Sequence, residues 1–305
     1  MREDGFMKHI FIINPNAGIV NTFEKTLNAI KQYQDKYDIL IHKTTHEKEA
    51  TQFIKEVATK NTGEHLRFYA CGGDGTINEV ANGVMGLENV SMSVYPCGSG
   101  NDFVKAIGGK EKYLDIENLL NAKTKKIDVL NVKNHCYCIN VCNFGFDSMV
   151  AKTANSLKGS KIKNPYEIGK IKAVFFGMHN KISVEADGKV LNPSGKMLLT
   201  TLANGDFVGG KYKCAPRYKI DDGLIEVCIV SPVSIFTFLK LAKQYELGNH
   251  LSDKRFEKYI SYTQAKNIKI YSKKPFDICI DGEIINGKEF EVEIIEKAID
   301  FAILE

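Results

Sequence analysis

The sequence predicts an α/β, Rossmann-like N-terminal domain followed by a predominantly β C-terminal domain. Three observations support this prediction. Apolar runs alternate with amphipathic stretches over about the first 130 residues, two glycine-rich loops follow apolar runs in that part, and short strand patterns separated by turn residues follow Asp128. A chain of 305 residues usually forms two domains, so the change of pattern near residue 130 marks the expected boundary.

The N-terminal elements follow one another as strand and helix. We expect strands at 9–13, 38–42, 66–70 and 92–96 because these runs are apolar and short. We expect helices over 23–37, over 50–58 and from residue 76 onward, where apolar residues recur at helical spacing.

The first glycine-rich loop lies directly after the strand at 66–70. Gly72, Gly73 and Gly75 permit positive φ and a close approach of the backbone to a ligand. Thr76 and Glu79 have the spacing of a capping box at the start of a helix, whose free N–H groups and dipole favour an anion. The sequence therefore predicts a phosphate-binding loop, with a simple tight turn as the alternative.

A second loop has the same design. Gly98, Ser99, Gly100 and Asn101 follow the strand at 92–96, and the strand at 9–13 ends in the loop 14–18 with the sequence NPNAG. Because ligands of doubly wound sheets bind at the carboxyl ends of the strands, these loops are expected to face one crevice.

The second part of the chain reads as β structure. Strands are expected at 198–202, 225–230, 268–271 and 276–280, and one amphipathic helix at 233–247, which either packs on the core or contacts a membrane. The segment 173–178 is either core or acyl-chain lining. Asp281 and Glu283 flank Gly282, so that strand alternation would point both carboxylates to one side; a hairpin turn is the competing interpretation.

Composition excludes several classes of protein. The 41 basic and 37 acidic residues are too balanced for a nucleic-acid-binding protein. No apolar run approaches the roughly 20 residues of a membrane span, and the first residues lack a signal-peptide pattern, so a cytoplasmic protein is expected. The eight cysteines are interpreted as reduced thiols. The segment 205–212 is not a P-loop, because Tyr212 stands where a Ser or Thr hydroxyl is required.

The motifs NPNAG (14–18), GGDGTINEVANG (72–83), PCGSGNDF (96–103) and DGE (281–283) resemble the lipid kinases of the diacylglycerol-kinase and sphingosine-kinase superfamily, particularly the soluble bacterial members. The catalytic domain of that family is related to phosphofructokinases and NAD kinases. The resemblance implies an ATP-binding catalytic domain over 1–130, to which about 295–305 returns, and a β-sandwich lipid-substrate domain over 131–294.

The resemblance also implies an activity. It is transfer of the γ-phosphoryl group of ATP, with Mg²⁺, to a lipid hydroxyl, with diacylglycerol as the expected acceptor. The alternatives are an NAD or sugar kinase, and a regulator that binds nucleotide or lipid without turnover. The expected partners are the lipid substrate and, transiently, the inner face of the membrane; a homodimer is compatible with the resemblance, and a nucleic acid is not expected.

Site residues carry over from the family motifs. The nucleotide site would comprise Asn14, Asn16, Thr44, Gly72, Gly73, Gly75, Thr76, Glu79, Gly98, Ser99, Gly100 and Asn101. Asp74, Asp102 and Asp128 would bind Mg²⁺ directly or through water, and Asp221 a structural cation, although each of these residues could simply form a turn or cap. Asp281, with Glu283 beside it, is the expected general base, and Asp74 is the alternative.

Overall fold

The computed structural model describes residues 7–18, 22–157 and 164–304, and the chain divides into two compact units. Unit 1 comprises Met1–Val129 and Glu296–Glu305, and unit 2 comprises Leu130–Ile295. The chain therefore enters unit 2 once and leaves it once, with unit 2 inserted in the sequence of unit 1.

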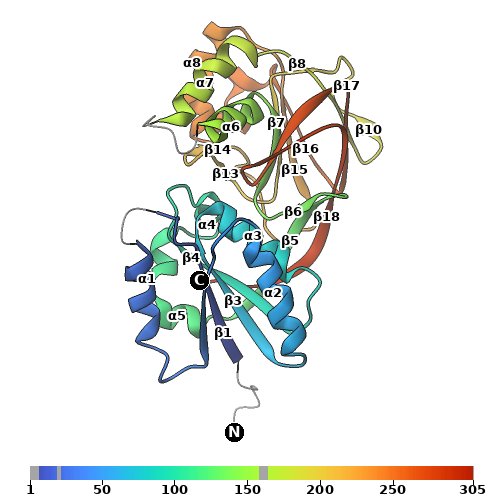
Figure 1. Ribbon diagram of the computed structural model, residues 1–305. Coiled ribbons are helices and arrows are strands. Elements are labelled where there is room, and N and C mark those ends of the chain that lie inside the picture. The colour runs from blue at the N-terminus through green and yellow to red at the C-terminus, as the bar shows by residue number, and fades with distance from the viewer. Residues whose placement is uncertain (1–6, 19–21, 158–163, 305) are drawn as a thin grey trace. The chain divides into compact units, whose positions relative to one another are not determined.

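Unit 1 contains a parallel sheet in the order β4-β3-β1-β2 (Figure 1). Its strands are β1 (Met7–Ile13), β2 (Ile39–Lys43), β3 (His65–Gly72) and β4 (Val90–Pro96). The last part of β18 (Glu283–Ala302) lies parallel to β4 on the other side, with Asp300 opposite Ser91. The predicted Rossmann-like α/β arrangement is confirmed.

The helices of unit 1 connect these parallel strands. They are α1 (Thr22–Lys31), α2 (Glu49–Lys60), α3 (Asp74–Val84), α4 (Asp102–Ala106) and α5 (Ile116–Leu120), with a 3-10 turn at Lys110–Leu114. The prediction of a helix over 23–37 was too long, because α1 ends at Lys31 and turns follow.

The core of unit 1 is apolar but contains one polar network. Ile10, Phe11 and Phe68 are fully buried, and the ring of Phe11 stacks on that of Tyr69 with centroids 4.2 Å apart. The Tyr69 hydroxyl lies 2.8 Å from Nδ1 of His9, which is also buried. Burial lowers the pKa of His9 to about 4, so this imidazole is neutral in the folded protein at neutral pH.

Unit 2 is built on an antiparallel sheet in the order β16-β15-β12-β7-β17-β18. The strands of unit 2 are β6 (Cys136–Cys138), β7 (Val141–Gly145), β8 (Asn180–Lys181), β9 (Ser183–Ala186), β10 (Lys189–Val190), β11 (Lys196–Met197), β12 (Leu199–Ala203), β13 (Phe207–Val208), β14 (Tyr212–Lys213), β15 (Ile225–Val230), β16 (Ile260–Ala265) and β17 (Asn267–Ile280). Of these, β8 pairs with β11 and β13 with β14 in separate two-stranded sheets. Two strands, β5 (Thr124–Val132) and β18, run from one unit into the other.

Within residues 130–157 and 164–295, three helices interrupt this β structure: α6 (Phe146–Ser156), α7 (Pro165–Phe176) and α8 (Ile235–Glu246). Short 3-10 turns lie at Asn249–Leu251 and Lys254–Phe256. Only α8 was predicted. The helix α7 depends on tertiary packing, because Gly169 lies so close to α6 that a Cβ there would be 2.6 Å from the carbonyl oxygen of Val150. Local sequence did not reveal that contact.

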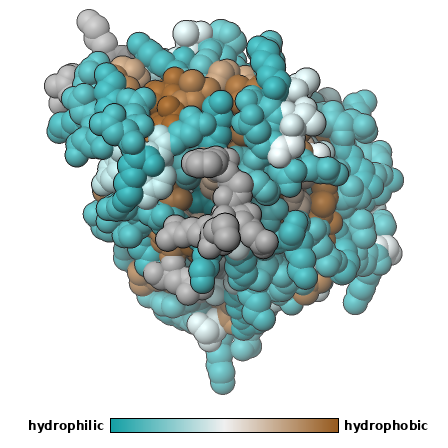
Figure 2. Space-filling model, turned by 90° about the horizontal axis from the view of Figure 1, so that it is seen from below, coloured by the Kyte–Doolittle hydropathy of each residue, from teal (hydrophilic) through white to brown (hydrophobic). Residues whose placement is uncertain are grey.

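Hydrophilic residues cover most of the face shown in Figure 2, with hydrophobic residues gathered in patches. Among the described residues, no helix is long and apolar enough to cross a membrane.

Candidate active site

The two glycine-rich loops pack directly on each other at the carboxyl ends of β3 and β4. Gly72 is opposite Pro96 in the sheet, and its carbonyl oxygen accepts the N–H groups of Cys97 at 2.9 Å and of Gly98 at 3.0 Å. A Cβ on Gly98 would lie 2.4 Å from the Cα of Gly73. Only a glycine at position 98 allows this backbone contact.

Gly72, Gly98 and Gly100 are needed for close approach rather than for an unusual backbone conformation. None of Gly72, Gly73, Gly75, Gly98 and Gly100 has a positive φ, so the positive φ that glycine permits is not used in these loops. A Cβ on Gly72 would lie 2.2 Å from Oγ1 of Thr76, and a Cβ on Gly100 would lie 2.8 Å from Oδ2 of Asp74 in the first loop. The loops are therefore tightly interlocked.

Asp74 ties the first loop to the second. Its Oδ1 accepts the N–H of Asp102 at 2.6 Å and that of Phe103 at 3.4 Å, and these two residues begin α4. The carboxylate of Asp102 is itself paired with Lys105 at 2.9 Å. Asp74 and Asp102, two of the predicted metal ligands, therefore lie in adjoining loops. Asp74 caps α4, whose first residue is Asp102.

The predicted capping box does not form, because α3 begins at Asp74 with Gly73 as its N-cap and no side-chain cap. Thr76 therefore lies within the first turn of the helix, where its Oγ1 accepts the side-chain amide of Asn14 at 3.2 Å. Glu79 accepts the N–H of Ala50, in the first turn of α2, at 3.3 Å. The NPNAG loop is thereby joined to α3, and α3 is joined to α2.

The backbone around these loops presents unpaired donors. Among the described residues, the N–H groups of Gly75 and Thr76 in the first turn of α3, and those of Ser99 and Gly100, donate to no protein acceptor. Asn101 has a φ of 48° and donates its side-chain amide to the carbonyl oxygen of Gly98 at 2.7 Å. Its buried Oδ1 has no hydrogen-bond partner in the part of the chain that the structure describes. Free N–H groups at a helix N-terminus suit an anion.

The remaining nucleotide-site candidates lie at the ends of β1 and β2. Asn14 Oδ1 accepts the N–H of Asn16 at 2.9 Å, which shapes the NPNAG turn. The buried Thr44 hydroxyl donates to the carbonyl oxygen of Ile13 at 3.4 Å. Thr45 instead bonds to Glu49, and hydrogen bonds from the Thr45 hydroxyl and backbone lower the pKa of that carboxyl to about 2. Thr44 is thus the inward-facing residue of the pair.

Asp128 is not grouped with the other metal-ligand candidates. It is fully buried on β5, and its Oδ1 accepts the backbone N–H of Lys297, which has a φ of 52°, at 2.7 Å. Asp221 lies in a turn just before β15, where Gly223 has a φ of 71°. Throughout the described residues, no three His, Cys, Asp or Glu side chains form a group that could hold a metal by themselves.

In unit 2, Asp281 holds a turn of the backbone. Its two carboxylate oxygens accept the N–H groups of Ile139 at 2.8 Å, Asn140 at 3.2 Å and Val141 at 2.9 Å. The thiol of Cys138 also lies 3.2 Å from Oδ1. A carboxylate with this many donors has its lone pairs engaged, so the geometry favours a structural role over proton abstraction.

Asp281 and Gly282 form the two-residue turn between β17 and β18, with φ values of 46° and 97°. The expectation that strand geometry continues and points Asp281 and Glu283 to one side was therefore wrong, and the hairpin-turn alternative is what forms. Glu283 begins β18 and is exposed. The described residues offer it no hydrogen bond or ion pair, so its carboxylate is accessible.

Unit 2 also contains buried polar side chains that were not predicted as site residues. Asn143 on β7 lies opposite Thr201 on β12, and both are buried with side-chain oxygens that lack a protein partner among the described residues. The same holds for Asp206 Oδ1 and the Tyr245 hydroxyl. Burial raises the pKa of Asp147, in the first turn of α6, to about 6. The sequence signal that could have identified these residues is the presence of polar side chains within apolar strand runs.

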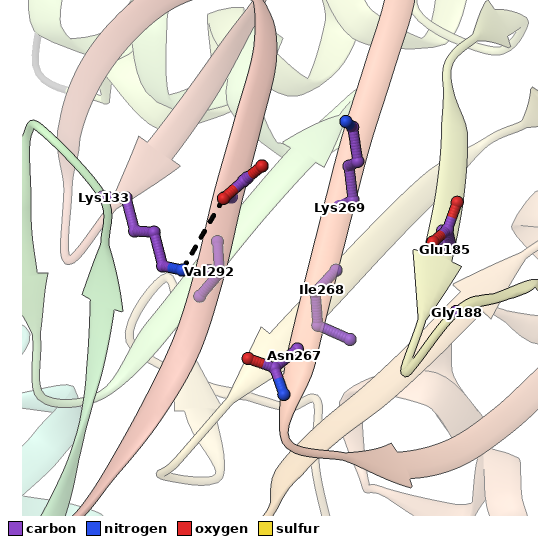
Figure 3. Close-up of a pocket in the computed structure, with 8 residues that line it drawn as sticks. Lys133, Glu185, Gly188, Asn267, Ile268, Lys269 and Val292 are labelled. Atoms are coloured by element: carbon purple, nitrogen blue, oxygen red, sulfur yellow. Dashed lines mark ion pairs between the residues drawn. The ribbon is translucent and has the colours of Figure 1, made fainter.

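A hollow on unit 2 is lined by none of these residues (Figure 3). Its volume is about 180 Å³, and Lys133, Glu185, Lys269 and Glu291 supply charges of both signs to its lining. Lys133 is ion-paired with Glu291 at 3.6 Å, as the dashed line shows, and with Glu293 at 2.9 Å. Lys269 is ion-paired with Glu289 at 2.8 Å, and the lining contains no nucleophile or predicted site residue.

Comparison with known proteins agrees with this architecture. Residues 8–132 match the diacylglycerol kinase catalytic domain, and residues 140–303 match the YegS C-terminal NAD kinase beta sandwich-like domain. The chain is 31% identical over 278 residues to a diacylglycerol kinase of Bacillus subtilis, covering 89% of this chain and 88% of that protein. The chain belongs to the diacylglycerol kinase family of lipid kinases. The prediction of an enzyme of this family is thus confirmed.

Solved structures give the same fold for this lipid kinase. A diacylglycerol kinase from Bacillus anthracis is similar with a TM-score of 0.71 at 21% identity, covering 97% of each chain. An NAD kinase from Archaeoglobus fulgidus, solved in complex with ATP, is similar with a TM-score of 0.51 at 9% identity, covering 96% of this chain and 93% of that one. The predicted NAD-kinase-like fold with a C-terminal β-sandwich is confirmed.

Proposed function

We propose that this lipid kinase transfers the γ-phosphoryl group of ATP to the hydroxyl of diacylglycerol, with Mg²⁺ as the metal ion. The observation that carries the proposal is the contact between the two glycine loops, where Gly98 approaches Gly73 too closely for any side chain. Phosphoryl transfer needs positioning and charge stabilisation more than covalent chemistry, and interlocked backbone loops supply positioning. The diacylglycerol kinase of Bacillus subtilis supports this choice of acceptor.

The phosphates would bind to backbone rather than to side chains. The unpaired N–H groups of Gly75, Thr76, Ser99 and Gly100 are suitable donors, and the dipole of α3 adds a favourable field. Asn14 would hold the NPNAG loop in place through its bond to Thr76.

The carboxylates of Asp74 and Asp102 fit Mg²⁺. This ion usually takes one or two carboxylates together with waters and substrate phosphates, so the lack of a three-residue protein cage among the described residues is no obstacle. When bound, Mg²⁺ would neutralise charge on the transferring phosphoryl group. Asp128 would then serve to hold the backbone at Lys297.

Glu283 would accept the proton of the lipid hydroxyl. It is exposed and unpaired within the described part of the chain, whereas Asp281 is occupied by three backbone N–H groups. Asp281 is accordingly a positioning residue that sets the hairpin from which Glu283 projects. Asp74 remains the alternative base.

The test measures transfer from γ-labelled ATP to dioleoylglycerol in mixed micelles with Mg²⁺, for the wild type and for Glu283→Gln, Asp281→Asn and Asp74→Asn. We expect Glu283→Gln to lower kcat by at least about 100-fold with ATP binding unchanged, because general bases contribute about 10²–10⁴-fold. The pH profile of Asp281→Asn should keep the wild-type shape.

Three results would overturn the proposal. If Glu283→Gln retains kcat while Asp74→Asn alone loses it, the base is Asp74. If labelled phosphate appears on NAD⁺ or a sugar and not on any lipid, the chain has a small-molecule acceptor. ATP binding without transfer to any acceptor would instead indicate a non-catalytic regulator.

A further inference from the structure

The tip of the hairpin between β17 and β18 is held by a side chain from α6. The side-chain amide of Asn155 donates to the carbonyl oxygen of Gly282 at 3.0 Å, across 127 positions of the sequence. This carbonyl belongs to the same planar peptide unit as the N–H of Glu283. The hydrogen bond therefore restrains the peptide plane from which Glu283 projects.

A second contact from α6 reaches the hairpin below its tip. Lys152 is ion-paired with one carboxylate oxygen of Asp277 on β17 at 2.7 Å. The other oxygen of Asp277 accepts the side-chain amide of Asn286 at 2.8 Å, and Asn286 lies directly opposite on β18. Because Lys152 and Asn155 are three residues apart, they lie on the same side of α6. One side of this helix thus contacts the hairpin at two levels.

Other contacts of α6 fix this helix within unit 2. Phe146, at the start of α6, belongs to the core cluster that also contains Ala173 of α7. Gly169 of α7 lies so close to α6 that a Cβ there would be 2.6 Å from the carbonyl oxygen of Val150. A close-packed core has little room for a helix to shift. The helix α6 is therefore a fixed support for the hairpin.

The two residues of the hairpin turn depend on different restraints. Asp281 is held through its carboxylate, which accepts the N–H groups of residues 139–141. Gly282 has a φ of 97° and no side chain, and a Cβ at this position would meet nothing within 4 Å among the described residues. Glycine also has the widest choice of backbone conformations. The amide of Asn155 thus supplies a restraint that Gly282 cannot obtain from packing.

We propose that Asn155 is a positioning residue of this lipid kinase, whose amide holds the Gly282–Glu283 peptide so that the Glu283 carboxylate is directed at the acceptor hydroxyl. Asn155 acts through Glu283 and not on the substrates. A general base must lie within about 2.6–3.2 Å of the atom that gives up its proton, so a small rotation of its peptide lowers the rate. The hold on the hairpin rests on the contacts of α6, whereas its benefit to catalysis rests on the proposed function.

The kinetic test compares Asn155→Ala with Ser156→Ala in the micelle assay with γ-labelled ATP. Ser156 is the exposed neighbour on α6, and its hydroxyl donates to the carbonyl oxygen of Thr153 in the same helix at 2.8 Å. We expect Asn155→Ala to lower kcat by about tenfold with KM for ATP within about twofold of the wild type, because a misplaced base slows the chemical step alone. Ser156→Ala should keep both values. Wild-type kcat in Asn155→Ala would overturn the proposal.

A double-mutant cycle distinguishes positioning from a general loss of structure. In Glu283→Gln the base is already absent, so adding Asn155→Ala should leave kcat within about twofold of that of Glu283→Gln alone. If Asn155→Ala instead lowers kcat by the same factor in both backgrounds, Asn155 acts independently of Glu283 and the proposal is wrong.

Hydrogen exchange measures the hold on the hairpin without catalysis. In protein without ATP or lipid, the backbone amides of residues 281–284 should exchange about tenfold faster in Asn155→Ala than in the wild type, and at the wild-type rate in Ser156→Ala. Faster exchange, together with a wild type that phosphorylates no lipid, would refute the proposed function and leave the hold of Asn155 on the hairpin standing. Unchanged exchange in Asn155→Ala would overturn the inference even if the wild type phosphorylates diacylglycerol.

Discussion

A pair of glycine substitutions distinguishes close packing of the loops from mere flexibility. In Gly98→Ala, the new methyl group would lie 2.4 Å from the Cα of Gly73. Carbon atoms in contact are normally about 3.5–4.0 Å apart, so the loops must separate by more than about 1 Å. Overpacking of this kind costs about 1–3 kcal/mol of the free energy of unfolding.

Gly75→Ala is the matched control, since it lies in the first of the same two loops and a Cβ there meets nothing within 4 Å. It is also the second residue of α3, where alanine stabilises the helix by up to about 1 kcal/mol relative to glycine. Urea denaturation of both variants measures these opposite effects on stability.

Measurements of ATP binding and of kcat should also distinguish Gly98→Ala from Gly75→Ala. A displacement of about 1 Å in a positioning loop can lower catalysis by about 100-fold, so Gly98→Ala should lose ATP affinity by isothermal titration calorimetry and lose kcat in the micelle assay. Gly75→Ala should bind ATP within about threefold of the wild type, because its N–H is retained. Equal loss in both variants, or no loss in Gly98→Ala, would refute the argument that close packing of the loops sets the site.

Three further predictions concern stability. The pKa of the buried His9 is about 4 in the folded state and 6.5 in the unfolded chain. The contribution of neutral His9 to the free energy of unfolding is therefore complete above pH 6.5 and is lost as the pH falls toward 4, amounting to about 3 kcal/mol. Denaturation at several pH values should show a smaller loss of stability in His9→Gln. Asp281→Asn should lower the free energy of unfolding by about 1–3 kcal/mol, because three backbone donors lose a charged acceptor. Glu283 is exposed, so Glu283→Gln should change the free energy of unfolding by less than about 0.5 kcal/mol. Equal effects would contradict the roles assigned to these two residues. Asp128→Ala should cost about 1–3 kcal/mol by leaving the Lys297 N–H without its acceptor, while Asp300→Ala, which removes an exposed ion pair to Lys126, should cost at most about 1 kcal/mol in thermal or urea denaturation.

The parts of the fold that sequence predicted are those set by local patterns. The strands of unit 1 are continuous apolar runs, and Gly72, Gly73 and Gly98 lie where two of these strands end. Parallel strands present their carboxyl ends at one edge of a sheet, so a shared site could be inferred before any distance was known.

The errors arose where a distant residue decides the local structure. Thr76 had the spacing of an N-cap, but the loop contact at Gly73 starts α3 earlier. The side chain of Asp281 points toward residues 139–141, because their N–H groups donate hydrogen bonds to its carboxylate. The alternation of side chains along a strand could not predict this, because the backbone of Asp281 is in the left-handed region. Helix α7 was not predicted because its packing against Val150 depends on α6.

The insertion of unit 2 into unit 1 has a consequence for biosynthesis. The strand β4 pairs on one side with the end of β18, and the Ser93 hydroxyl donates to the carbonyl oxygen of Ala302 at 2.9 Å. A ribosome makes β4 long before it makes Ala302, so a nascent unit 1 has an unpaired strand edge until the end of β18 has been translated. Unit 2 consists of contiguous residues and can complete its sheet before unit 1 does. The connectivity alone therefore lets unit 2 finish folding first, although the synthesis of unit 1 begins earlier.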